Sequence, residues 1–246
     1  MKALNAVLAG LVALPLIGAG TSQAARTRHP VFTQGAKAWA LATTAFLSYY
    51  NRDHVDMLTP NARNETNVAE TLGLLRDWWG IDSRAELFHS LDFLESGGHR
   101  ADFQKMGRSL VAMNDAQYRA ALSSQKSHPE RVRVMKLTRD HFRVSRANSL
   151  IAWDYGRYVM LCRWGYMVGF LTEDEAWARI MPVARTIQSS FHSWAEFGDD
   201  YLVGREFWST DQMDRNGTIY RDIEKWLLTA PRSPWKQLPW RTVLGS

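Results

Sequence analysis

The chain of 246 residues is 46% apolar and 22% charged, which provides material for a substantial core and excludes an intrinsically disordered polymer. With 30 Lys and Arg against 25 Asp and Glu, the formal charge of +5 makes the protein mildly basic. Its single cysteine, Cys162, cannot form an intramolecular disulfide and lies in an apolar run, so we expect a buried, inert thiol. Stability must therefore come from packing.

The first 24 residues have the pattern of a secretory signal peptide, with Lys2, an apolar run and small residues that end at Ala24. We expect cleavage after Ala24 or Ala25, which predicts a periplasmic or secreted protein. Residues 25–34 then form a linker to the folded part. The alternative is an uncleaved segment that anchors the protein in the inner membrane through residues 3–20.

Residues 35–246 are predicted to form a single α-helical domain. Apolar residues recur at helical spacing almost throughout this range, while alternating runs rich in Val and Ile are nearly absent. The expected fold class is therefore all-α, with about eight helices. They are predicted over residues 35–51, 65–79, 83–96, 99–124, 129–142, 146–170, 173–197 and 218–229.

Local signals set several helix ends. The pair Gly97 and Gly98 is expected to stop the third helix, and the sequence TEDE at residues 172–175 has the form of a capping box. Pro182 lies inside the seventh predicted helix, so we expect a kink there or a break just before it.

The C-terminal sequence APRSPWKQLPWRTVL differs from the rest of the chain. It interleaves three prolines with Trp235 and Trp240, a pattern that cannot be helical and predicts an extended strap. Two indoles on a free tail would expose a large apolar area, so we expect them to pin the strap onto the helices.

Metal and cofactor motifs fail when their spacing is counted. Glu86 and His89 have the spacing of two ligands on one helical face, but a di-iron bundle needs a second copy, which the sequence lacks. Residues 212–224 resemble a calcium loop in the wrong register and are interpreted as a turn. Motifs of zinc peptidases, serine hydrolases and phosphate loops are also missing. No metal and no cofactor is predicted.

A basic stretch lies near the middle of the chain. Four of its cations follow at steps of three and four residues and would form one ridge if the helix continues past Phe142. Such a ridge suits anionic lipid headgroups, a cell-wall glycan or polymer, or an acidic envelope protein, whereas the export signal disfavours nucleic acid. A solvated surface without a partner is the alternative. The ridge residues are Lys136, Arg139, Arg143 and Arg146.

Several short motifs follow one another in a distinctive order: WWGI, GHR, WDYGR, RWGY, SWAEFG, GREFW, SPW and LPW. In this combination the chain resembles the bacterial domain-of-unknown-function family 1266, over roughly residues 35–241. The resemblance implies an α-helical single domain. It implies no particular activity, because the family has none that could be carried over.

The stretch LIAWDYGRYVMLCRWGYMVGFL places Asp154, Arg157 and Arg163 in an apolar, aromatic setting. On a helix, Asp154 and Arg157 can pair, and Trp153 can stack on Arg157. A buried carboxylate bonded to guanidinium groups has a depressed pKa and is a poor proton donor, so we interpret Asp154 as structural. A catalytic or ligand-binding carboxylate is the alternative.

Two functions are compatible with these residues. The first is a non-catalytic envelope protein that binds a partner through a tryptophan-rich groove or the basic ridge. The second is a hydrolase acting on cell-envelope material, with His99 as base, Asp154 or Glu196 as orienting or acidic group, and an arginine that stabilises negative charge. The candidate arginines are Arg100, Arg157 and Arg205. Convergence of these residues on an open pocket would favour the enzyme, and burial in pairs the scaffold.

Overall fold

Side-chain caps start most of the helices. In a computed structural model, which describes residues 35–245, the side chains of Asn64, Ser83 and Ser193 accept hydrogen bonds from backbone N–H groups of the following turns. Thr172 and Glu175 form the predicted reciprocal capping box. These contacts satisfy N–H groups that a helix leaves without a partner in its first turn, so they set where each helix begins.

The described residues form α-helices and no strand, which confirms the all-α fold class. The signal peptide predicted over residues 1–24 and the linker over 25–34 lie outside the described residues. The helices, in chain order, are α1 (Ala36–Ala42), α2 (Ala45–Asn51), α3 (Glu65–Trp79), α4 (Arg84–Ser96), α5 (Gly98–Val111), α6 (Asp115–Ser124), α7 (Pro129–Ser145), a short 3-10 helix (Arg146–Asn148), α8 (Ile151–Met167), α9 (Glu173–Ser190), α10 (Trp194–Trp208), α11 (Thr210–Thr229) and α12 (Pro234–Gln237).

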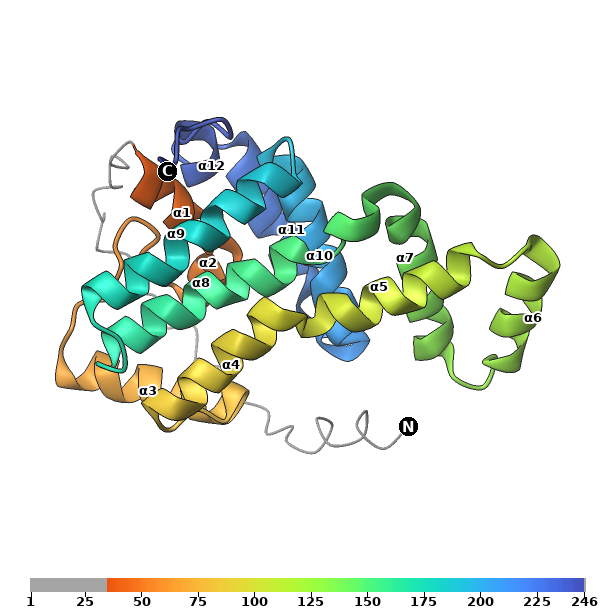
Figure 1. Ribbon diagram of the computed structural model, residues 1–246, viewed down its shortest axis with the longest axis horizontal. Coiled ribbons are helices and arrows are strands. Elements are labelled where there is room, and N and C mark those ends of the chain that lie inside the picture. Colours follow the sequence, from red (N-terminus) through yellow and green to blue (C-terminus); the bar gives the residue numbers. More distant parts are fainter. Residues whose placement is uncertain (1–34, 246) are drawn as a thin grey trace.

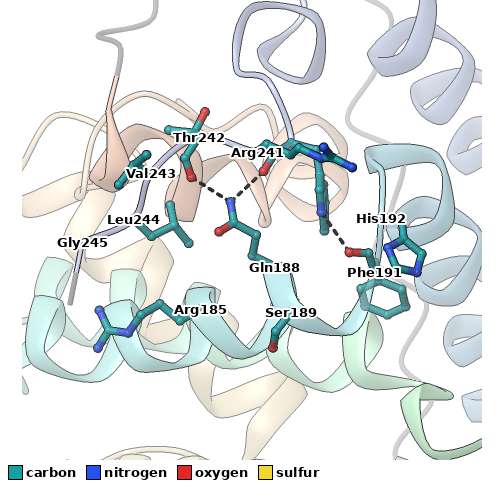
Figure 2. A pocket seen from close by; sticks show the side chains of 11 residues that line it. Arg185, Gln188, Ser189, Phe191, His192, Arg241, Thr242, Val243, Leu244 and Gly245 are labelled. Atoms are coloured by element: carbon teal, nitrogen blue, oxygen red, sulfur yellow. Dashed lines mark hydrogen bonds between the residues drawn. The ribbon is translucent and has the colours of Figure 1, made fainter.

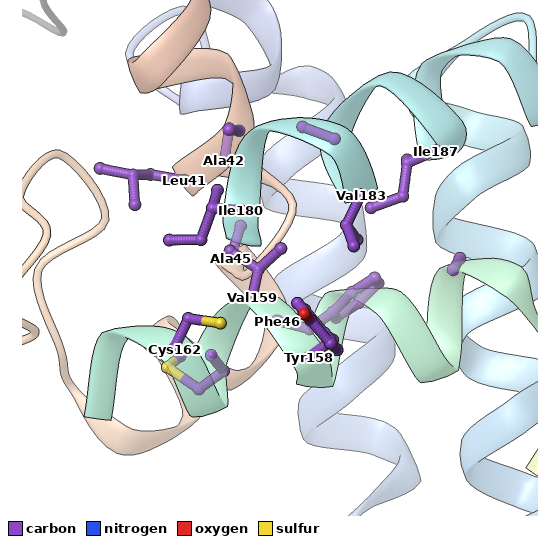
Figure 3. Packing of buried hydrophobic residues seen from close by; sticks show 14 of the residues in the cluster. Leu41, Ala42, Ala45, Phe46, Tyr158, Val159, Cys162, Ile180, Val183 and Ile187 are labelled. Carbon is purple, nitrogen blue, oxygen red and sulfur yellow. The ribbon is translucent and has the colours of Figure 1, made fainter. Parts of the chain in front are cut away.

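Helix α8 is the central element and carries the aromatic stretch noted in the sequence. Helices α4, α9 and α10 pack around it (Figure 1), and most of its residues are buried. A helix that is apolar on every side must lie inside a protein. Figure 3 shows side chains of α8 and α9 meeting in the core, among them Val159, Ile180 and Val183.

Cys162 is fully buried in this core, as expected. Burial raises the pKa of its thiol well above the ordinary value, so the reactive thiolate is disfavoured.

Four predicted helices are divided in the structure, and the segment 146–170 is one of them, because the 3-10 helix Arg146–Asn148 ends before α8 begins. The segment 35–51 breaks at Thr43 and Thr44, whose hydroxyls donate to carbonyls of the preceding turn. The segment 99–124 breaks where Asn114 and Gln117 form a capping box, and the segment 173–197 breaks at a new cap, Ser193. Each break places a short polar side chain where it competes with the helical backbone.

The turn predicted over residues 212–224 is wrong, because these residues belong to α11. The inward face of α11 carries Met213, Gly217 and Tyr220, so the glycine lies on the packed side of the helix rather than at a loop. That spacing of three and four residues is a helical signal which the resemblance to a calcium loop obscured. Helix α9 runs without a break through Pro182, so of the two expectations only a kink there stays a prediction.

The C-terminal strap is pinned as predicted. The indole of Trp235 is 4% exposed, stacks on Trp194 and donates to the carbonyl oxygen of Ala42 at 3.0 Å. Trp240 donates to the carbonyl oxygen of Phe191 at 3.0 Å. One helical turn, α12, interrupts the strap, contrary to the expectation that no part of it is helical. Pro234 occupies the first position of this turn, where a proline costs no hydrogen bond.

Candidate functional site

Asp154 is the centre of the polar cluster that the sequence singled out. The residue is 0% exposed and its carboxylate accepts four hydrogen bonds. Two come from the backbone N–H groups of His99 and Arg100, at 3.2 and 3.0 Å. The other two come from the guanidinium groups of Arg100 and Arg157, at 3.1 and 2.8 Å. The carboxylate is therefore saturated by groups of the protein itself.

The backbone contacts place the carboxylate at the N-terminus of α5. A helix N-terminus carries partial positive charge and unpaired N–H groups, so it is a natural site for an anion. Gly98 makes this approach possible. Its φ of 53° lies in the left-handed region, and a Cβ atom at this position would overlap the Asp154 carboxylate. Asp154 thus occupies the anion site of α5 and leaves no room there for an external ligand.

Arg157 contacts two indole rings. Its guanidinium carbon is 4.1 Å from the ring centre of Trp153, as the spacing predicted, and 5.3 Å from that of Trp79. Its Nε also donates to the carbonyl oxygen of Trp153 at 3.0 Å. Burial lowers the pKa of Arg157, and the neighbouring Asp154 opposes this effect. The buried charge is thus held by one carboxylate and two aromatic faces.

His99 is fixed in one neutral form. Its Nδ1 accepts hydrogen bonds from Trp153 Nε1 at 3.1 Å and from Arg157 Nη2 at 2.8 Å. A nitrogen that accepts two hydrogen bonds carries no proton, so the proton of the neutral ring lies on Nε2. Burial and the charge of Arg157 lower the pKa of His99 to about 3. At neutral pH neither nitrogen is arranged to take a proton from a substrate.

Two of the predicted site residues have no part in this cluster. Glu196 is exposed and caps α10, where its carboxylate accepts from the backbone N–H of His192 at 2.8 Å. Arg205 is 6% exposed and stacks on the ring of Tyr220 at 3.8 Å. The structure therefore brings together His99, Arg100, Asp154 and Arg157, and leaves Glu196 and Arg205 to separate structural roles.

A second buried aspartate, Asp200 on α10, has a similar arrangement. Its two carboxylate oxygens accept from the backbone N–H groups of Leu150 at 2.7 Å and Ala152 at 2.9 Å, at the start of α8. His141 Nε2 is 2.8 Å from the same carboxylate. Burial raises the pKa of Asp200, and these three partners oppose the rise. Sequence reasoning missed this cap, because no local pattern links Asp200 to residues about fifty positions away.

Arg163, the third charge of the aromatic stretch, holds a loop. It is 0% exposed and donates to the hydroxyls of Thr44 and Ser48, both at 2.8 Å. Its other nitrogen donates to the carbonyl oxygens of His54 and Met57. Burial lowers the pKa of Arg163 to about 10. Its hydrogen-bond acceptors are neutral oxygen atoms and the thioether of Met160, so its role is to tie the segment after α2 to the core.

The predicted cationic ridge is interrupted. Arg139 is 6% exposed, stacks over Tyr118 at 3.7 Å and lies 3.6 Å from the carboxylate of Asp115. It faces α6 rather than solvent, which corrects the expectation of four aligned cations. Lys136, Arg143 and Arg146 are exposed, although α7 ends at Ser145, before Arg146.

Three of the tryptophans are packed in the core and line no groove. Trp39 and Trp194 lie 4.8 Å apart, and Trp194 stacks on Trp235 at 5.3 Å, all three within the core. A shallow depression lies between α9 and the C-terminal strap, where Gln188 donates to the carbonyl oxygens of Trp240 and Thr242 (Figure 2). No residue of the Asp154 cluster lines it.

Among residues 35–245, no group of three His, Cys, Asp or Glu side chains is placed to hold a metal ion. None of the helices described there is both long and apolar enough to span a bilayer.

An all-α domain whose buried aspartates cap neighbouring helices is the class that the fold and the cluster define. Residues 74–240 match the family described as Protein of unknown function (DUF1266), and the chain belongs to this family. It is 24% identical to the uncharacterized protein YbeU of Escherichia coli (strain K12) over 142 residues, 57% of this chain and 59% of that protein. It is 22% identical to YbeR, another uncharacterized protein of the same organism, over 55% of this chain and 57% of that protein. The chain thus spans under two thirds of these relatives, and no solved structure matches it.

Proposed function

We propose that this protein is an exported, non-catalytic helical module of the bacterial cell envelope that binds a partner. The observation that carries the proposal is the saturation of Asp154, which is fully buried and accepts four hydrogen bonds from its own chain. A catalytic carboxylate needs a free oxygen that faces a substrate. Charged side chains that are buried and paired with one another are what we expect of a non-catalytic scaffold.

The hydrolase acting on envelope material is the alternative, and it depends on His99 as a base. The hydrogen bonds to Nδ1 and the pKa of about 3 oppose that role. Glu196, the other candidate acid, is occupied as a helix cap. Support for the non-catalytic role therefore comes from three residues, Asp154, His99 and Glu196.

Replacement of Asp154 by Asn tests the role of the cluster, because the two functions predict opposite changes in stability. If the carboxylate is structural, the variant should lose about 3–5 kcal/mol of unfolding free energy, because the charge is removed from a buried ion pair. A catalytic carboxylate should give a variant that is as stable as the natural protein or more so, because active sites are often not optimised for stability. Chemical denaturation of both proteins decides between these outcomes.

Export is tested by the mass of the native protein. The apolar run and the small residues up to Ala24 lead us to expect a mature chain that starts at Arg26 or Ala25. Intact mass measurement of material from the envelope fraction should show this truncation. Soluble protein that keeps Met1 would contradict the signal peptide, and membrane-bound protein that keeps it would favour the anchor at residues 3–20.

A further inference from the structure

Charge is distributed very unevenly along the chain. Residues 105–146 contain ten Lys and Arg against three Asp and Glu, a formal charge of +7. The whole chain has 30 against 25, so the remaining residues have 20 against 22 and a formal charge of −2. The basic character of this protein therefore comes entirely from one segment, which we call the basic arm.

The basic arm also projects from the rest of the protein at its far end. Helices α5, α6 and α7 extend away from the other helices, with α6 at the far end (Figure 1). None of the residues of α6 is buried. Helix α6 therefore contributes little to the core, so its composition is free to serve contacts outside the protein.

Most cations of the arm have no acidic partner. Two of the ten are paired: Arg133 with Glu206 and Asp214, and Arg139 with Asp115. The other eight are exposed, and among the described residues none of them has a carboxylate oxygen within 4.0 Å. They are Lys105, Arg108, Arg119, Lys126, Arg131, Lys136, Arg143 and Arg146.

The side chains of the arm favour a diffuse anionic surface over a protein partner. Tight protein interfaces depend on exposed Trp and Tyr anchors near their centre. The arm has no Trp, its one Tyr, Tyr118, is covered by Arg139, and its one Phe, Phe142, is buried. Val144, in contrast, is 84% exposed beside Arg143. Scattered cations with an exposed aliphatic side chain suit lipid headgroups, which attract each cation without a fixed geometry.

We propose that the basic arm docks this protein onto a membrane surface rich in anionic phospholipid. The inference rests on the proposed binding role and names its partner. The eight unpaired cations supply the attraction, and the −2 charge of the remaining chain keeps the other faces turned away from the bilayer.

The test measures binding of the full chain to vesicles of phosphatidylglycerol and phosphatidylcholine, with vesicles of phosphatidylcholine alone as reference. The arm variant carries Arg119→Gln, Lys136→Gln and Arg143→Gln. The matched control carries Lys225→Gln, Arg232→Gln and Lys236→Gln, three exposed cations outside the arm. Both variants lose the same charge, so a difference between them reports the position of the cations. The reference vesicles remove any attachment that does not depend on lipid charge.

We expect the natural protein to bind the anionic vesicles and to dissociate as salt shortens the screening length from about 10 Å at 0.1 M to about 3 Å at 1 M. Loss of three cations from the arm should weaken binding by about 100-fold, and the control should change it by less than about threefold. Equal weakening in both variants would overturn the proposal. So would binding to duplex DNA or poly-glutamate that is tighter than binding to the vesicles. A stable Asp154→Asn variant would instead contradict the non-catalytic role and leave this result unaffected.

Discussion

Asp200 caps α8, the helix that carries Asp154, and Asp154 in turn caps α5. The carboxylate of Asp200 on α10 accepts from the backbone at the start of α8, and that of Asp154 on α8 accepts from the backbone at the start of α5. Each helix is therefore positioned by a charge from its neighbour. These two caps explain how an apolar core can hold two buried carboxylates, since each carboxylate is bonded to backbone N–H groups and to a basic side chain.

The pair of Asp154 and Arg157 should be strongly coupled. Asp154→Asn leaves the buried charge of Arg157 without a carboxylate, and Arg157→Gln removes one of the two guanidinium groups that bond to Asp154, so we expect each to cost about 3–5 kcal/mol. The double variant should cost less than the sum by about 1–3 kcal/mol. Denaturant unfolding of the four proteins measures this. The exposed pair of Arg84 and Glu175 is the control and should show weak coupling, because solvent screens it. Additive effects at Asp154 and Arg157 would show that they do not act as a buried pair.

Gly98 should tolerate no side chain. Gly98→Ala places a methyl group against the Asp154 carboxylate and forces a left-handed backbone, which should cost about 2–4 kcal/mol. Gly73 in α3 is the matched control, because a Cβ there meets nothing within 4 Å. Gly73→Ala should stabilise the protein by up to about 1 kcal/mol through helix propensity. Thermal melts of both variants give the comparison, and similar melting temperatures would contradict the cap at α5.

Asp200→Asn should also destabilise the fold. The carboxylate uses one oxygen for the N–H of Leu150 and the other for that of Ala152, whereas an amide offers only one acceptor. One buried N–H is then left without a partner, at a cost of about 1–3 kcal/mol. The neighbouring exposed residue provides the control, Asp199→Asn, which should have little effect. Hydrogen exchange at the first turn of α8 should rise in Asp200→Asn alone, and unchanged protection there would count against the cap.

Glu224 should make stability depend on pH. Burial, with a contribution from Asp199, raises the pKa of Glu224 to about 7, and its Oε1 is buried without a hydrogen bond. The folded state therefore holds a proton that the unfolded state releases near pH 4.5. The stabilisation is complete below pH 4.5 and is lost as the pH rises through 7.

Replacement by Gln removes this loss, so Glu224→Gln should exceed the natural protein by about 1–2 kcal/mol at pH 8 and match it at pH 4. Denaturation curves measured across this range provide the test. The exposed Glu70→Gln is the control and should leave the pH profile unchanged. A constant difference between Glu224→Gln and the natural protein at all pH values would contradict the raised pKa.

The sequence by itself determined the features that depend on near neighbours along the chain. Helices follow from apolar residues three and four positions apart, the capping box of Thr172 and Glu175 spans four residues, and the pair of Asp154 and Arg157 is one turn apart. These contacts need no knowledge of the fold, and the structure confirms each of them. The predicted helix boundaries were wrong where one polar residue, such as Asn114, began a new helix inside a continuous apolar pattern.

Only the tertiary structure decided what the charged residues do. The N–H groups that hold Asp154 come from residues 54 and 55 positions away, and Asp200 meets its backbone partners across about fifty. Arg139 has the same spacing as its exposed neighbours, yet packing against α6 buries it. Helical periodicity determines the side of a helix on which a residue lies, whereas burial and pairing depend on which other helix covers that side. That choice is made by the packing of the whole domain.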